Sequence, residues 1–178
     1  MQLCSAITGG VPLGKLLPEA ADYDAADLRV YGCVCDSRSV APGDLFVAIR
    51  GQRVDGTLFA AEAAQRGAVA IACEEPLIES TLPVVRVANA RETYARLCQQ
   101  FAGNPGDRLK LIGVTGTNGK TTTSHLIAGI LSAAGYDCGL VGTLGYFDGI
   151  DLEPASWTTP PPDVLADLLA RMAANGCS

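Results

Sequence analysis

The residues with the clearest chemical potential form one short segment, residues 113–123, which reads GVTGTNGKTTT. Gly116 and Gly119 lack a Cβ, so backbone N–H groups can converge there and approach an anion closely. Lys120 and Thr121 follow directly, and they offer an ammonium for the β- and γ-phosphates of a nucleotide and a hydroxyl that can ligate Mg²⁺. The pattern predicts a phosphate-binding loop.

The flanking elements decide whether this prediction holds. We expect a strand over residues 109–114 and a helix from about Thr121, whose first turn adds unpaired N–H donors and the positive end of the helix dipole. The usual spacing places a glycine at position 114, where this chain has Val114; glycines stand at 113 and 116 instead. The alternative is a glycine-rich connection with a chance Lys-Thr pair, and the strand and helix around it disfavour that interpretation.

Residues 115–123, TGTNGKTTT, resemble the ATP-binding loop of the Mur ligase family. Five further segments resemble the same family: DSR at 36–38, PGDLFVA at 42–48, GQRVDG at 51–56, GLVGTLG at 139–145 and TTP at 158–160. The resemblance extends from about residue 29 to the end of the chain. Within the family it is strongest to the member that adds the third amino acid to UDP-N-acetylmuramoyl-L-alanyl-D-glutamate (UDP-MurNAc-L-Ala-D-Glu). Folylpolyglutamate synthetases share the loop but lack this kind of leading domain.

The resemblance implies an ATP-dependent acid–amino-acid ligase of peptidoglycan synthesis. In the implied reaction the γ-phosphoryl group of ATP passes to the D-glutamyl carboxylate, and the amine of diaminopimelate or lysine attacks the resulting acyl phosphate. ATP and Mg²⁺ are the implied cofactors, with Lys120 as the catalytic residue and Thr121 as the metal ligand. The implied nucleotide-binding residues are Gly116, Thr117, Asn118, Gly119, Lys120, Thr121 and Thr122.

The resemblance also implies contacts to the UDP-MurNAc substrate. The implied residues are Cys35, Ser37, Gln52, Arg53, Val54, Thr158 and Thr159. From the residues alone, segment 36–38 could equally be an ordinary turn with local side-chain capping. Arg38 could pair with a phosphate or with the nearby Asp44. Thr159, which precedes Pro160, also fits a helix N-cap, and this role is compatible with a substrate contact.

The pattern of apolar runs predicts an α/β fold in two parts. The segment GNPGD at 103–107 is the best linker candidate, so we expect a small mixed α/β substrate domain over 1–106 and the first, incomplete part of a P-loop parallel-sheet ATPase domain over 107–178. Strands are expected at 29–35, 44–49, 68–73, 83–88, 109–114 and 138–143, helices at 57–66, from Asn89, from Thr121 and at 160–175, and a hairpin at 148–149. Strand 109–114, its helix and strand 138–143 should form a right-handed crossover.

Composition excludes several other classes. The chain has 178 residues, 48% of them hydrophobic, and a net charge of −6 with no basic run, which argues against a nucleic-acid-coating surface. No apolar stretch reaches membrane-spanning length and no secretory signal is visible, so we expect a cytoplasmic protein without membrane partners, as a monomer. The seven scattered cysteines are expected to be reduced and mostly packed in the core, and His125 to be structural or solvent-facing.

Two other functions remain as alternatives. The chain could be a nucleotide-sugar-binding module without turnover, or another P-loop protein such as a folylpolyglutamate synthetase relative or a kinase, although a kinase would leave the leading domain unexplained. The last expected helix ends where a further strand should follow. We therefore expect the front portion of a longer enzyme, which cannot catalyse ligation by itself, and the sequence does not decide which amino acid is added.

Overall fold

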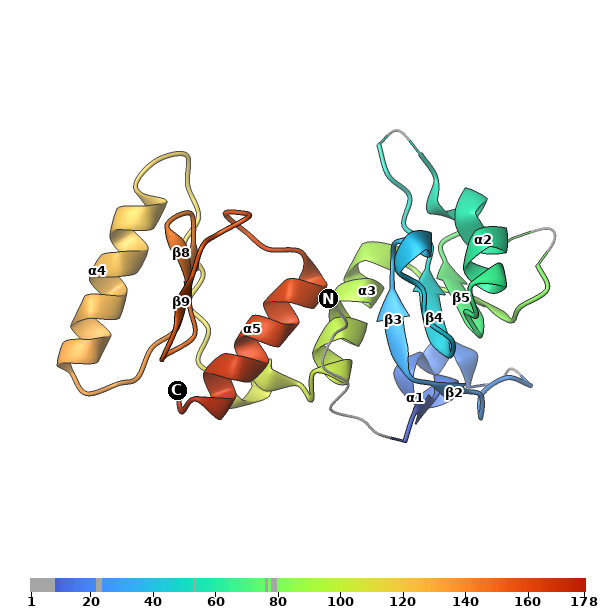
Figure 1. Cartoon of the computed structure of the whole chain (residues 1–178), viewed down its shortest axis with the longest axis horizontal. Coiled ribbons are helices and arrows are strands. Elements are labelled where there is room, and N and C mark those ends of the chain that lie inside the picture. The colour runs from blue at the N-terminus through green and yellow to red at the C-terminus, as the bar shows by residue number, and fades with distance from the viewer. Residues whose placement is uncertain (1–8, 22–23, 53, 76, 78–79) are drawn as a thin grey trace. The chain divides into compact units, whose positions relative to one another are not determined.

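The computed structural model describes residues 9–21, 24–52, 54–75, 77 and 80–178. The chain divides into two compact units, Met1–Phe101 and Ala102–Ser178 (Figure 1).

The first unit is built on a four-stranded parallel sheet in the order β3-β4-β5-β6. The strands are β3 (Gly32–Val34), β4 (Asp44–Val47), β5 (Ala70–Cys73) and β6 (Val84–Arg86). Every residue of the two central strands is buried, as is typical of a parallel sheet covered on both faces. Short apolar runs in the sequence therefore became buried strands, as predicted.

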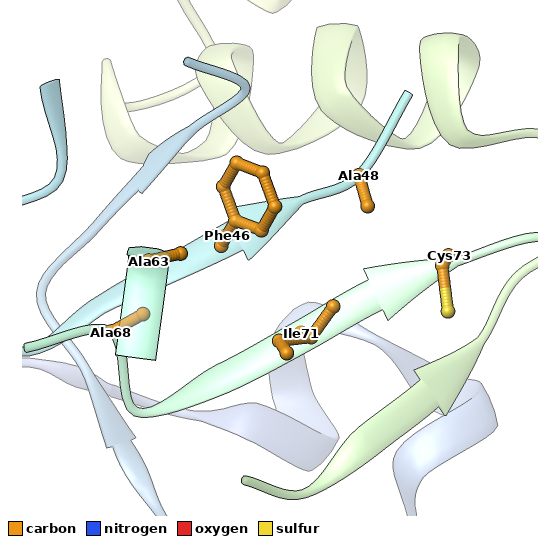
Figure 2. Packing of buried hydrophobic residues seen from close by; sticks show 6 residues of the cluster. All are labelled: Phe46, Ala48, Ala63, Ala68, Ile71 and Cys73. Carbon is orange, nitrogen blue, oxygen red and sulfur yellow. The ribbon is translucent and has the colours of Figure 1, made fainter. Parts of the chain in front are cut away.

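Helices α2 (Ala60–Gln65) and α3 (Ala90–Phe101) cover opposite faces of this sheet. Phe46 packs with Ala63 of α2 in one apolar cluster, which Figure 2 shows from close by. Cys33 is paired in register with Leu45, the neighbour of Phe46, so its side chain points to the other face. There its Sγ lies 3.9 Å from the Sγ of Cys98 in α3. The unit thus has three layers, helix, sheet and helix.

The cysteines in these layers behave as small apolar residues. Cys33, Cys73 and Cys98 are buried free thiols. The neighbouring Cys98 thiol, together with burial, raises the pKa of Cys33 well above its ordinary value. The expectation of reduced, packed cysteines is confirmed for these residues, whereas Cys4 lies outside the described residues.

The remaining elements of the first unit are short. They are β1 (Val11–Pro12), α1 (Leu13–Leu16), β2 (Arg29–Val30) and the 3₁₀ helices η1 (Pro18–Ala20), η2 (Ser37–Ser39) and η3 (Gly56–Phe59). The predicted strand 29–35 is divided in two, because β2 pairs with β1 whereas β3 joins the parallel sheet. Asn89, where a helix was predicted to begin, caps α3, since its Oδ1 accepts a hydrogen bond from the Glu92 N–H at 3.0 Å.

The second unit contains two long helices and an antiparallel meander. Its elements are η4 (Pro105–Arg108), α4 (Lys120–Ala133), β7 (Leu140–Gly142), β8 (Gly145–Phe147), β9 (Leu152–Glu153) and α5 (Pro162–Ala174). The strands pair in the order β7-β8-β9. The predicted hairpin is confirmed: Asp148 Oδ1 accepts hydrogen bonds from the N–H groups of Ile150 and Asp151, at 3.1 and 2.9 Å.

The predicted strand over residues 109–114 is wrong, and the crossover that depended on it is not formed by the described residues. Residues 110–115 have no strand assignment, and Leu111 and Ile112 are well exposed. A strand is stabilised by its ladder to a neighbour, and β7, the expected partner, pairs with β8 in an antiparallel register.

Arg171 of α5 holds the hairpin in place. Its guanidinium donates to the Glu153 carboxylate at 2.7 and 3.0 Å and to Asp148 at 3.2 Å. Hydrogen bonds from the N–H groups of Asp151 and Ile150, with the charge of Arg171, lower the pKa of Asp148. Among the described residues, none of the helices is both long enough and apolar enough for a bilayer crossing.

Candidate functional site

The glycine loop has the backbone conformation that its sequence predicts. Residues 116–119 lead directly into the first turn of α4 (Figure 1). Gly116 has φ 149° and Gly119 has φ 78°, both in the region that residues with a Cβ rarely adopt. A Cβ at either position would meet no atom closer than 3.5 Å, so the backbone angle rather than crowding calls for glycine. The Gly119 carbonyl accepts the first helical hydrogen bond, from the Thr123 N–H at 2.9 Å.

Lys120 begins α4 and turns its ammonium back onto the loop. Its Nζ donates to the carbonyl oxygens of Gly116 and, at 3.4 Å, Thr117. The ammonium therefore lies at the same end of α4 as the unpaired N–H groups of the first helical turn, where the helix dipole is also positive. A phosphate bound at this loop would compete with the two carbonyls for the ammonium.

Thr121 lies one residue further along α4, and its Oγ1 is 3.0 Å from the Oγ1 of Thr143, which follows β7. When one hydroxyl donates to another, the donor oxygen keeps lone pairs for a cation, and Mg²⁺ prefers oxygen ligands. Backbone amides, an ammonium and a hydroxyl together fit a Mg²⁺-bound nucleotide phosphate. Thr143 was not identified individually from the sequence; its only signal was its place in segment 139–145.

A cavity of about 670 Å³ lies in the second unit beside the loop. Its polar wall includes Gly116, Lys120, Thr121, Thr143, Thr158 and Thr159, and Ile127 and Leu131 of α4 contribute to its apolar wall. The structure therefore brings the start of α4 together with the threonine pair, which is more than thirty residues away in sequence. Thr117, Asn118, Gly119 and Thr122 are exposed on the loop and first turn, outside this lining.

Thr159 does not cap α5. That helix begins at Pro162, and its N-cap residue Pro161 has no side-chain hydrogen bond to the helix. The N-cap prediction for Thr159 is wrong because two further prolines delay the start of the helix. Thr158 and Thr159 are both exposed.

The substrate-contact residues implied for the first unit follow two neighbouring strands. Cys35 and Ser37 come after β3, and Gln52 and Val54 come after β4. Because β3 and β4 are parallel, both segments leave the sheet at its carboxyl edge, where open α/β sheets usually bind ligands. Cys35, Gln52 and Val54 are exposed. Arg53 lies outside the described residues.

Ser37 is only 5% exposed, and its hydroxyl donates to Glu62 of α2 at 2.7 Å. This hydrogen bond, followed by the interaction with Arg66, lowers the pKa of Glu62. Arg66 also donates to the backbone carbonyl of Arg38 at 3.4 Å. Hydrogen bonds to Glu62 of α2 and from Arg66 at its end therefore fix the 36–38 turn against this helix. The sequence did not indicate the contact with Glu62.

Arg38 pairs with Asp36 and not with Asp44, the protein group considered from the sequence. Its guanidinium donates to both carboxylate oxygens of Asp36, at 2.9 and 2.7 Å, and these bonds lower the pKa of Asp36. Asp36 also caps η2 by accepting from the Arg38 N–H at 3.0 Å. Asp44 instead accepts from the Ala41 N–H at 2.8 Å, and burial raises the pKa of this carboxyl. The two-residue separation of Asp36 and Arg38 favours the local pair.

A parallel α/β unit followed by a glycine loop that opens a helix defines a class, the α/β proteins with a phosphate-binding loop. Comparison with known families narrows it. Residues 29–102 match the Mur ligase family, catalytic domain, and residues 114–178 match the Mur ligase middle domain. The chain belongs to the Mur ligase family.

Individual relatives agree with this assignment. The chain is 44% identical, over 163 residues, to the UDP-N-acetylmuramoyl-L-alanyl-D-glutamate--2,6-diaminopimelate ligase of Chlorobaculum tepidum. The aligned region covers 90% of this chain and 32% of that protein. The ligase of the same name from Geobacillus thermodenitrificans is 48% identical over 141 residues, covering 79% of this chain and 29% of the relative. A solved structure of a ligase of this name superposes with a TM-score of 0.69 at 29% identity, covering 95% of this chain and 34% of the other. The chain spans about a third of the length of these relatives.

Proposed function

We propose that this chain forms the leading part of an ATP-dependent ligase that adds diaminopimelate or lysine to UDP-MurNAc-L-Ala-D-Glu. The observation that carries the proposal is the cavity of the second unit, which Lys120 and Thr121 line together with the Thr158–Thr159 pair. This arrangement would place a nucleotide phosphate and the reacting end of the substrate beside each other. The names of the relatives support the substrate, since both are 2,6-diaminopimelate ligases acting on UDP-N-acetylmuramoyl-L-alanyl-D-glutamate.

In the proposed division of labour, residues 1–106 bind the UDP-MurNAc part of the substrate through Cys35, Ser37, Gln52, Arg53 and Val54. Ser37 would act through its backbone or by exchanging its hydrogen bond with Glu62. Residues 107–178 form the first part of the ATP-binding domain.

The loop residues bind and orient phosphate in this proposal. Backbone amides of residues 116–121 hold the phosphates, and the Lys120 ammonium neutralises charge as the γ-phosphoryl group moves to the substrate carboxylate. Thr121 would provide a hydroxyl ligand for Mg²⁺, and the ion would supply positive charge that stabilises the phosphates. Thr122 and the exposed loop residues Thr117 and Asn118 complete the nucleotide contacts.

We propose that the protein acts in the cytoplasm as a monomer without a membrane or nucleic-acid partner. A water-soluble nucleotide-sugar substrate is compatible with that setting, and a net charge of −6 without a basic run disfavours nucleic-acid binding. We also propose that the 178-residue chain alone does not catalyse ligation, because it spans about a third of its relatives.

The test uses the protein encoded by the complete reading frame that contains this sequence. We expect it to convert UDP-MurNAc-L-Ala-D-Glu, ATP and either diaminopimelate or lysine into the tripeptide, ADP and phosphate, as measured by mass spectrometry and phosphate release. Absence of product with both amino acids would contradict the proposal. If no product forms and calorimetry shows binding of the UDP-sugar but not of Mg-ATP, the result would favour a binding module without turnover instead.

A further inference from the structure

Tyr146 makes two hydrogen bonds to the backbone of a single residue. Its phenolic oxygen accepts from the N–H of Trp157 at 2.9 Å and donates to the carbonyl oxygen of Trp157 at 2.7 Å. Tyr146 is only 5% exposed, so both bonds form at a buried ring. A phenol can donate one hydrogen bond while it accepts another, and here both capacities serve the same residue.

The position of this hydroxyl is fixed by the sheet. Tyr146 belongs to β8, the central strand of the meander, and it pairs in register with Val141 on one side and Glu153 on the other. The hydroxyl is therefore attached to a strand that is hydrogen-bonded along both edges.

Trp157, in contrast, lies in a segment without regular structure. Residues 154–161 connect β9 to α5 and have no helix or strand assignment. Because both backbone polar groups of Trp157 bind the same hydroxyl, a displacement of the segment at this point would break at least one of the two bonds. Thr158 and Thr159 follow directly, and they line the cavity with Lys120 and Thr121.

We infer that Tyr146 is a positioning residue that fixes the Thr158–Thr159 pair at the cavity beside the glycine loop. The inference rests on the proposed function for the role of the threonines in substrate binding, but the anchoring itself does not. Loss of the hydroxyl should release the segment, weaken binding of the UDP-sugar and leave the glycine loop unchanged.

The test compares Tyr146→Phe with Tyr136→Phe, a matched control whose ring follows α4 and is 50% exposed. In the complete ligase we expect Tyr146→Phe to raise KM for UDP-MurNAc-L-Ala-D-Glu about tenfold, a change that corresponds to the loss of about one hydrogen bond to the substrate. The KM for ATP should stay within about twofold of the wild-type value. Tyr136→Phe should match the wild type. Equal kinetics for both variants would overturn the inference.

A second readout separates the anchor from the reaction. Trp157 is the single tryptophan of the 178-residue chain, so its fluorescence reports on this segment alone. In the 178-residue chain, acrylamide should quench the Trp157 fluorescence more efficiently in the Tyr146→Phe variant than in the Tyr136→Phe variant. Equal quenching in the two variants would refute the anchor. If wild-type ligation fails while quenching rises, the proposed function is wrong and the anchor stands.

Hydrogen exchange in the wild type covers the case in which Tyr146→Phe does not fold. The Trp157 amide should exchange more slowly than the amides of Thr158 and Thr159, because it donates to the Tyr146 hydroxyl. Exchange of the Trp157 amide as fast as its two neighbours would overturn the inference.

Discussion

Replacing Lys120 by Ala in the complete ligase should lower ATP-dependent ligation by at least about a thousandfold, the scale on which a cation stabilises phosphoryl transfer. The ammonium of Lys120 lies at the glycine loop and at the N-terminus of α4. Without this ammonium, the backbone amides of the loop are the remaining positive groups of this segment. They are fixed in place and cannot move with the negative charge on the transferred phosphoryl group. The measurement is phosphate release with saturating substrates.

The fold should survive this substitution. Within the described part of the chain, the Lys120 ammonium bonds only loop carbonyls, so the thermal unfolding midpoint should change little. Lys15→Ala, which removes an exposed ammonium from the first unit, is the matched control and should keep wild-type turnover. Ligation by Lys120→Ala within about tenfold of the wild type would contradict the assigned role.

Replacing Phe46 by Ala should lower the free energy of unfolding of the first unit by about 3–5 kcal/mol. Phe46 is completely buried in β4, and its cluster contains the small residues Ala48, Ala63 and Ala68 (Figure 2). Short side chains cannot extend into the space that the ring leaves, so most of the cavity should persist. Urea denaturation of the 178-residue chain, followed by circular dichroism, measures the change.

The matched control is the same truncation at Phe59, which ends η3 and is 42% exposed. Phe59→Ala should cost less than half as much, because the ring already contacts solvent. Equal losses at the two positions would show that Phe46 does not occupy the core as described.

The sequence predicted the first unit well because its signals are local. Short apolar runs were enough to place β4 and β5, and the helix predicted from Asn89 does start there, because the Asn89 side chain caps it. The sequence also predicted the backbone conformation of the glycine loop, because Gly116 and Gly119 need no distant partner to adopt a positive φ.

What the sequence did not predict depends on distant or competing partners. Segment 109–114 has a strand's composition, but among the described residues β7, its expected neighbour, forms a ladder with β8 alone and leaves its other edge unpaired. Arg38 had Asp36 and Asp44 as nearby acidic groups, and it pairs with Asp36, which is closer in sequence. Glu62 and Thr143 act across 25 and 22 residues, and nothing in the local sequence marks such contacts.

The most direct test of the account is a crystal structure of the complete ligase with Mg²⁺ and a non-hydrolysable ATP analogue. We expect β- and γ-phosphate oxygens within hydrogen-bond distance of the main-chain N–H groups of residues 116–121. The Lys120 ammonium should then contact phosphate oxygens and no longer the carbonyls of Gly116 and Thr117. An analogue bound elsewhere at full occupancy, with Lys120 still on those carbonyls, would contradict the account.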